Sequence, residues 1–242
     1  MIKRKDAIVL RSFDYRNSSK IIHILTQDSK RISLVAKGAR RTNSQFGGDI
    51  EPLNLSQVVY YIKPDRDIGI LKEATMIEPY LSLKNDLYRL NIGWGFACVG
   101  EKIPDPQDGL FGLEKRSLTF LDRGFKEEVF VYFLLSLFHL SGVSPKLNSC
   151  VCCGSRDVEF FNIRKGGAQC ANCMGKDSFP FGDLQELMND LRKGRLRVWE
   201  EINESKKGKI LQITFKYGVY HLGDWLNRLR DILPFDIIPN ER

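Results

Sequence analysis

The cysteine residues constrain this chain more tightly than any other feature of its sequence. Five of its six cysteines fall between residues 150 and 173. Cys150 and Cys153 form one C-x2-C pair, Cys170 and Cys173 form a second, and sixteen residues separate the pairs. Each pair turns two thiolates toward one point, and a loop of this length can bring both turns to one ion. The spacing therefore predicts a tetrahedral site for one zinc ion, which paired turns around a ribbon-like loop favour over an iron–sulfur cluster.

The run "CVCC" leaves a choice of ligand in the first pair. Cys150 could pair with Cys152, but Gly154 follows Cys153 and the second pair has the same two-residue spacing. We therefore expect Cys153 to be the ligand and Cys152 to be a spare thiol. Because four thiolates leave no coordination position open for water or substrate, the zinc ion is expected to be structural.

The first eighty residues contain five short runs rich in Val, Ile and Tyr, which predict β-strands. Polar turn segments separate these runs, which cover residues 6–13, 20–27, 31–38, 56–63 and 68–77. A small all-β unit avoids exposed edges best by closing on itself, so we expect a five-stranded barrel. The strand number fits an OB-fold, although an SH3-like barrel also has about five strands.

Helical spacing of apolar residues replaces the strand pattern after residue 80. Asp183 is the expected N-cap of one helix, and Gly194 is expected just past its end. The predicted helices cover residues 81–103, 110–124, 126–142, 183–194 and 208–233.

These elements predict an α+β fold with two domains. Residues 1–80 would form an OB-fold β-barrel, and residues 81–242 would form an all-α domain that carries the four-cysteine zinc finger at about 147–178. The apolar run 129–140 is shorter than the ~20 residues that span a bilayer, and no secretory signal is present. We therefore expect a cytoplasmic protein that does not contact a membrane.

Positive charge is concentrated in the first 41 residues. They hold eleven Lys and Arg against three Asp and Glu, a net of +8, whereas the whole chain carries +7. A basic loop at the rim of a barrel can lie along a phosphate backbone, so this distribution predicts DNA binding. The expected DNA contacts are Lys37, Arg40 and Arg41, extended by Lys20, Lys30 and Arg31.

Three aromatic residues near these charges, Phe13, Tyr15 and Phe46, could stack on unpaired bases, whereas the alternative for Phe13 is a place in the core. The sequence lacks the motifs G-x-x-x-x-G-K-[ST], G-x-S-x-G and H-E-x-x-H. No histidine neighbours a plausible nucleophile, and His139, within an apolar helix, is expected to be a buried core residue. A binding protein without catalytic residues is therefore predicted. Two alternatives stay open, a zinc-ribbon OB-fold protein that binds RNA or rRNA and a zinc-dependent nuclease.

Four blocks of the sequence together resemble the bacterial RecO family of recombination mediators. They are "AIVLRSFDYRNSSKIIHILTQDSKRISLVAKGARR", "LSGVSPKLNSCVCCG", "FFNIRKGGAQCANC" and "HLGDWLNRLRDIL". The resemblance implies an OB-fold followed by a helical domain with a zinc finger. By matching positions it implies that the four cysteines named above hold zinc and that Lys37, Arg40 and Arg41 contact DNA.

The resemblance also implies a function and partners. The chain would bind single- and double-stranded DNA and anneal complementary strands at the bacterial nucleoid. With RecR, it would load RecA onto DNA coated by single-stranded-DNA-binding protein. The helical domain is expected to dock the acidic C-terminal tail of the latter protein through His221, Arg228 and Arg230 on the last helix.

Overall fold

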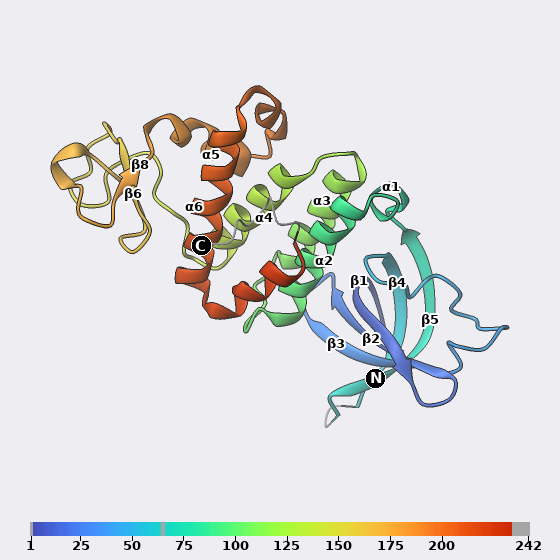
Figure 1. Ribbon diagram of the computed structural model, residues 1–242. Coiled ribbons are helices and arrows are strands. Elements are labelled where there is room, and N and C mark those ends of the chain that lie inside the picture. The colour runs from blue at the N-terminus through green and yellow to red at the C-terminus, as the bar shows by residue number, and fades with distance from the viewer. Residues whose placement is uncertain (1, 64–65, 234–242) are drawn as a thin grey trace. The chain divides into compact units, whose positions relative to one another are not determined.

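The computed structural model describes residues 2–63 and 66–233, and the chain divides into two compact units, Met1–Gly124 and Phe125–Arg242. The first unit holds a β-barrel and three helices, and the second is mainly helical (Figure 1). Within the described residues, no helix is both long enough and apolar enough to cross a membrane.

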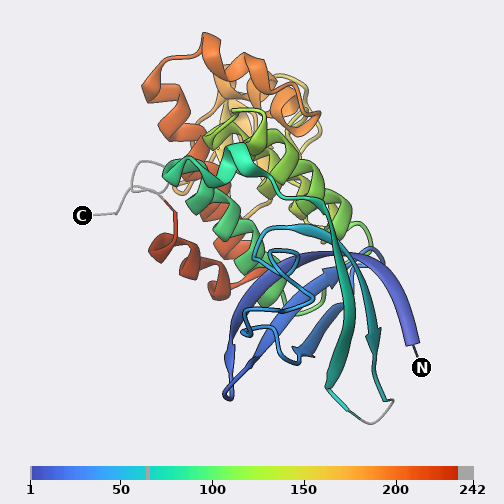
Figure 2. The ribbon, with the colours of Figure 1, turned by 90° about the vertical axis from the view of Figure 1, so that its right-hand side faces the viewer.

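Five strands close into the barrel that the sequence predicts. They are β1 (Ile2–Tyr15), β2 (Ser19–Thr26), β3 (Arg31–Ala36), β4 (Leu55–Tyr61) and β5 (Ile68–Glu78). Their order around the barrel is β1-β2-β3-β5-β4, and β4 pairs with β1 to close it. Strands β3 and β5 run parallel, whereas all the other pairs are antiparallel. Figure 2 shows these strands, in blue to cyan, wrapping around one another. The barrel is an OB-fold, which decides between the two predicted barrels.

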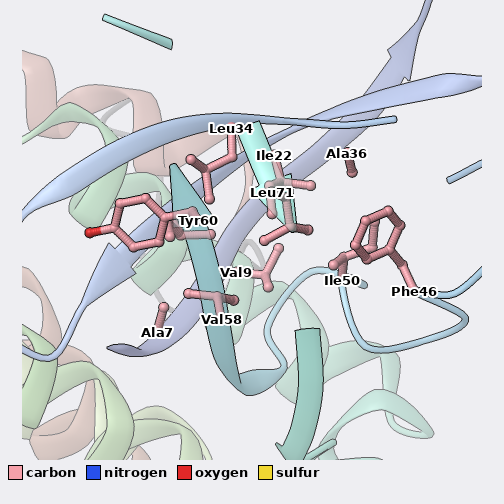
Figure 3. Packing of buried hydrophobic residues seen from close by; sticks show 11 residues of the cluster. Ala7, Val9, Ile22, Leu34, Ala36, Phe46, Ile50, Val58, Tyr60 and Leu71 are labelled. Atoms are coloured by element: carbon pink, nitrogen blue, oxygen red, sulfur yellow. The ribbon is translucent and has the colours of Figure 1, made fainter. Parts of the chain in front are cut away.

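Alternating side chains fill the barrel interior (Figure 3). Val9, Ile22, Leu34 and Val58 are fully buried there, as period-two strands with one buried face require. Phe46, from the loop between β3 and β4, is 1% exposed and packs in the same core. The prediction that Phe46 stacks on bases is therefore wrong, because the loop turns this ring inward to cover the barrel end.

A β-bulge changes which face of β1 points outward. Val9 pairs with Ile24 and Arg11 pairs with His23, so Leu10 is the extra residue. Before the bulge, Ala7 and Val9 point into the core. After the bulge, the odd-numbered residues of β1 point outward instead. One inserted residue thus reverses the face that the rest of β1 presents.

Three helices complete the first unit: α1 (Leu81–Lys84), α2 (Leu87–Lys102) and α3 (Leu110–Asp122). The prediction of one continuous helix over residues 81–103 is wrong. Asp86 has an extended backbone, and its side chain accepts a hydrogen bond from the Arg89 amide at 3.1 Å, so α2 begins anew after it. Aspartate favours such an N-cap because its carboxylate satisfies an otherwise unpaired helix N–H.

Glu114 of α3 is a carboxyl group buried in the first unit, 1% exposed. A side chain at Gly100 of α2 would clash with its Oε1 atom and lie 3.0 Å from Leu10, so the absence of a Cβ there makes room for the acid. Burial raises the pKa of Glu114 well above its ordinary value, and the Gly100 amide offsets only part of this effect. Folded Glu114 therefore keeps its proton over a pH range where the unfolded chain has lost it.

We expect Glu114→Gln to remove a pH dependence from folding stability. Because the folded pKa is raised, the stabilisation is complete below the unfolded pKa of 4.5 and is lost as pH rises through the folded value. Between the two pKa values, each pH unit costs about 1.4 kcal/mol. Urea unfolding of both proteins between pH 5 and 9 should show the wild type losing stability relative to the variant. Parallel stability curves would contradict this expectation.

The second unit is built from α4 (Glu127–Leu140), α5 (Gln185–Arg192) and α6 (Glu204–Leu222). Four 3-10 helices accompany them: η1 (Ala171–Cys173), η2 (Gly182–Leu184), η3 (Leu196–Glu201) and η4 (Asp224–Asp231). Helix α4 is buried on nearly every side, as its apolar sequence predicts. His139, however, is exposed near the end of α4, so the prediction that it is a core residue is wrong.

Two helix ends in this unit differ from those that the sequence predicts. Asp183 does not cap α5, because η2 precedes the helix and Asp183 instead pairs with Lys206 at 3.1 Å. Gly194 lies just past the end of α5, as predicted, with φ of 79°. The last predicted helix is interrupted at Gly223, where φ of 107° separates α6 from η4.

Candidate metal site and nucleic-acid surface

The four predicted metal ligands come together within the second unit. The sulfur atoms of Cys150, Cys153, Cys170 and Cys173 all lie within 4.8 Å of one another, and the Sγ atoms of Cys153 and Cys170 are 3.7 Å apart. A tetrahedron with Zn–S bonds of about 2.3 Å has sulfur–sulfur edges of about 3.8 Å. A disulfide requires about 2.05 Å, and all six cysteines are free. The group therefore has the ligand set and the spacing to hold a metal ion.

Tight backbone turns bring the sulfur atoms of each pair together. In the first turn, the Gly154 amide donates to the Cys150 carbonyl at 3.0 Å. Gly154 has φ of 81°, a left-handed conformation that glycine adopts without steric cost. In the second turn, η1, the Cys173 amide donates to the Cys170 carbonyl at 3.1 Å.

The crowding of four thiols favours a cation at their centre. Backbone N–H groups, that of Cys153 above all, lower the pKa of the Cys150 thiol to about 5. Contacts with the thiols of Cys170 and Cys153 raise the pKa of Cys173 to about 12, so Cys150 and Cys173 do not ionise over the same pH range in the free protein. A bound metal cation would offset the repulsion between thiolates and allow all four to ionise.

Cys152 lies outside the group of four, as predicted. It is exposed, and its Sγ atom lies 3.3 Å from Gln169 Nε2 and 3.7 Å from Lys165 Nζ. Sequence reasoning missed Gln169, a fully buried amide that donates to the Cys173 carbonyl at 2.7 Å and accepts from Ser178 Oγ at 2.6 Å. The only sequence feature that could have identified Gln169 is its position directly before Cys170, in a short apolar strand.

Residues 146–181 form a small lobe around the four cysteines, called the metal lobe below. Its three-stranded sheet has the order β7-β6-β8, with β6 (Phe160–Asn162), β7 (Gly167–Gln169) and β8 (Phe179–Pro180). In Figure 1 the lobe is the yellow to orange segment that carries β6 and β8.

Aromatic packing attaches the metal lobe to α6. The ring of Phe161 lies 5.0 Å from that of Phe181 and 6.0 Å from that of Tyr217 on α6, measured between centroids. His221 stacks on Tyr217 at 4.1 Å, and its Nε2–H donates to the Ile163 carbonyl at 2.8 Å. The structure thus places His221, one of the predicted partner residues, in an internal contact between lobe and helix.

A cavity of about 980 Å³ lies between the metal lobe and α6. Phe179 of the lobe and Val219 of α6 contribute apolar walls, and Lys209 and Arg230 are among its cations. The Arg230 guanidinium stacks on Phe215 at 4.8 Å. Of the other two predicted partner residues, Arg230 therefore lines this cavity, and Arg228 is exposed on η4.

The structure separates the six predicted DNA contacts into two groups. Lys37, Arg40 and Arg41 lie in the loop after β3, and Lys20 lies beside them because it pairs with Ala36 across the strands. Lys30 and Arg31 stand at the opposite end of β3. Arg31 donates to the Glu101 and Pro104 carbonyls at 2.7 and 3.2 Å, so it ties the barrel to the end of α2.

The basic loop after β3 is fastened to the turn between β1 and β2. The Arg40 amide donates to the Ser18 carbonyl at 3.0 Å, and Arg40 Nε lies 3.1 Å from Asp14 Oδ2. Lys20 Nζ lies 3.2 Å from Glu51 Oε1. Lys37 and Arg41 are exposed, and neither makes an ion pair with another residue that the structure describes. Of the four predicted contacts at this end of the barrel, these two side chains are therefore the most available.

Comparison with known protein families shows to which family the chain belongs. The family model "Recombination protein O N terminal" matches residues 1–80, and "Recombination protein O C terminal" matches residues 102–230. The chain belongs to the RecO family. The first match ends two residues after β5, and the second includes the whole metal lobe.

Curated RecO proteins are similar over most of their length. DNA repair protein RecO of Rubrobacter xylanophilus is 34% identical over 202 residues, which are 76% of this chain and 79% of that protein. The protein of the same name from Bifidobacterium animalis subsp. lactis is 31% identical over 176 residues, 70% of this chain and 73% of its own. The RecO protein of Halalkalibacterium halodurans is 26% identical over 236 residues, 92% of either chain.

Proposed function

We propose that this chain is a DNA repair and recombination mediator without catalytic activity. It binds single- and double-stranded DNA and promotes annealing of complementary strands at the nucleoid, in the cytoplasm. The observation that carries the proposal is an OB-fold barrel with a basic loop at its rim, in a chain of the RecO family. The residues that we propose as the DNA-binding domain are 1–80, with the helical domain over 81–242.

Charge neutralisation by the barrel is the proposed mechanism. Lys37 and Arg41 would contact phosphates first because they are exposed, and Lys20 and Arg40 would join them by exchanging Glu51 and Asp14 for phosphate oxygens. Each phosphate contact releases counterions, which gives affinity without reading sequence. Two strands held with neutralised phosphates repel each other less, so complementary bases can pair. Lys30 and Arg31 would contribute less, since they lie at the other end of β3.

Protein partners would act through the helical domain. We assign to it RecR and the acidic C-terminal tail of single-stranded-DNA-binding protein, with RecA loading as the outcome. The cavity between metal lobe and α6 supports the tail assignment, because it combines apolar walls with the cations Lys209 and Arg230. An acidic peptide would place carboxylates on these cations, and His221 would act indirectly by holding the lobe wall in place.

One structural zinc ion is the proposed cofactor, bound by the group of four cysteines. Four thiolates suit zinc, and they leave no coordination position for the water that a zinc-dependent nuclease requires. The ion would then stabilise the metal lobe, and DNA cleavage would not be observed.

An annealing assay tests the proposed function. Complementary strands, each coated with single-stranded-DNA-binding protein, should pair at least about tenfold faster with the wild type than without it. The variant Lys37→Ala/Arg40→Ala/Arg41→Ala should lose most of this acceleration because its phosphate contacts are gone. Equal annealing by both proteins, or cleavage of the strands that a chelator abolishes, would contradict the proposal. Tighter binding to structured RNA than to single-stranded DNA would favour the RNA-binding alternative.

A further inference from the structure

The outer face of the barrel carries a row of aromatic and aliphatic side chains. Phe13 of β1 pairs with Ile21 of β2, Ile21 with Val35 of β3, and Val35 with Ile70 of β5. Residues directly opposite each other on neighbouring strands share one face of the sheet. Phe13 is 37% exposed, and the other three are partly exposed.

The bulge at Leu10 creates this row. Without the extra residue, Phe13 would continue the inward series of Ala7 and Val9 into the barrel core. With it, Ser12 pairs with the buried Ile22, while Phe13 and Tyr15 point outward. Turning an aromatic ring toward water costs hydrophobic stabilisation. Bulges often re-aim side chains at functional sites.

One guanidinium group lies against each of the two outward rings. The Arg11 guanidinium carbon lies 5.5 Å from the Phe13 ring centroid, and that of Arg16 lies 5.1 Å from the Tyr15 centroid. Arg40 also donates from Nη1 to the Arg16 carbonyl at 3.2 Å. The rings therefore adjoin the basic loop after β3, and together they form one surface in which aromatic faces alternate with positive charges.

We propose that this surface stacks unpaired bases on Phe13 and Tyr15 and thereby makes the chain prefer single-stranded over double-stranded DNA. The proposal rests on the proposed function, because the phosphates must be held by the basic loop. Charge complementarity identifies the occupant: the rings offer π-faces, and Arg11, Arg16 and Arg40 offer contacts for a backbone beside them. In a duplex the base faces are covered by neighbouring base pairs, so only unpaired bases gain from the rings.

Binding of three DNA molecules of equal length tests this assignment: a dT oligonucleotide, an abasic oligonucleotide with the same phosphates, and a duplex. The wild type should bind dT about tenfold or more tighter than the abasic strand, since stacking contributes about 1–3 kcal/mol per base. The double variant Phe13→Leu/Tyr15→Leu, which keeps apolar side chains on the strand, should lose that advantage. Its affinity for the abasic strand and the duplex should stay within about twofold of the wild type.

A matched control is Ile77→Ala on β5, because Ile77 is an exposed apolar residue, 49% accessible, that lies outside the row. It should leave all three affinities unchanged. The assignment is overturned if the wild type binds dT and the abasic strand equally well, a comparison that needs no variant. It is also overturned if the folded double variant keeps the dT preference or loses affinity for all three molecules alike. Failure of the wild type to bind any of them would instead overturn the proposed function.

Discussion

Replacing Cys170 by Ser is expected to abolish metal binding and to destabilise the metal lobe. Cys170 is 7% exposed and its Sγ atom lies 3.7 Å from that of Cys153, so no other side chain can replace it without moving the turn. Metal binding to four-ligand sites of this kind contributes about 10–16 kcal/mol to the folding of isolated zinc fingers. The lobe has a core of its own around Phe161, which retains part of the structure when the metal is lost. We therefore expect a loss on the order of 4 kcal/mol, or about 10 °C in Tm.

Cys152→Ser is the matched control for this substitution. It removes a thiol from the same turn, but Cys152 is exposed and lies outside the group of four. Metal analysis of the purified proteins should give one zinc per chain for the wild type and Cys152→Ser, and none for Cys170→Ser. Thermal unfolding should separate the variants in the same way. Equal zinc content in the two variants, or loss of zinc in Cys152→Ser alone, would mean that the ligand set is a different one.

Loss of the metal should affect the stability of the metal lobe separately from the DNA affinity of the barrel. If zinc is structural, Cys170→Ser should lower stability before it lowers DNA affinity measured at a temperature where the barrel is still folded. A variant that stays folded by circular dichroism and nevertheless loses DNA binding would place the metal within the DNA site.

The second large effect is expected from Lys37→Ala/Arg40→Ala/Arg41→Ala. If each side chain neutralises one phosphate, the slope of log affinity against log salt concentration should fall in magnitude by about 2.7 for a duplex. Affinity at low salt should fall by roughly two orders of magnitude, and by a similar factor for unrelated sequences, because phosphate contacts do not read bases. Fluorescence anisotropy at several salt concentrations measures both quantities.

A control with the same change in net charge distinguishes local contacts from a general field. Lys176→Ala/Lys193→Ala/Arg197→Ala removes three exposed cations from the second unit. It should leave the salt slope nearly unchanged, since these three side chains lie outside the loop that we propose to contact phosphates. If both triple variants lose affinity to the same extent, net charge and not the loop after β3 governs binding.

Local patterns in the sequence were sufficient to predict much of the fold. Runs rich in Val, Ile and Tyr between polar turns predicted all five strands of the barrel, because each strand packs one face into a common core. The cysteine spacing predicted which four sulfur atoms come together, because two C-x2-C turns leave few other geometries. The break between α1 and α2 was not predicted, because an aspartate at position 86 is compatible with the surface of a continuous helix. Only the structure shows that the Asp86 side chain accepts a hydrogen bond from the Arg89 amide and so begins α2.

Long-range features explain the remaining differences. The burial of Phe46 depends on how the loop between β3 and β4 folds back over the barrel, which no local pattern encodes. Arg31 appears in the sequence as one more basic residue, yet two carbonyl groups about seventy residues later in the chain bind it. Likewise, the outward direction of Phe13 depends on a bulge at Leu10, and the sequence around it reads as an uninterrupted strand.

The strand order also sets the sequence of events during synthesis. Strands β1 to β3 can pair as soon as residue 36 is available. The outer edge of β3 cannot pair until β5 is synthesised, and the outer edge of β1 cannot pair until β4 is synthesised. At about 5–20 residues per second, the forty or so residues up to Glu78 take roughly 2–8 s to appear. Throughout that time both outer edges of a three-stranded sheet are open to other nascent chains. Lys3, Arg4 and Lys5 lie on the edge that β4 later covers, so the same excess of positive charge that would attract DNA also guards the incomplete barrel against aggregation.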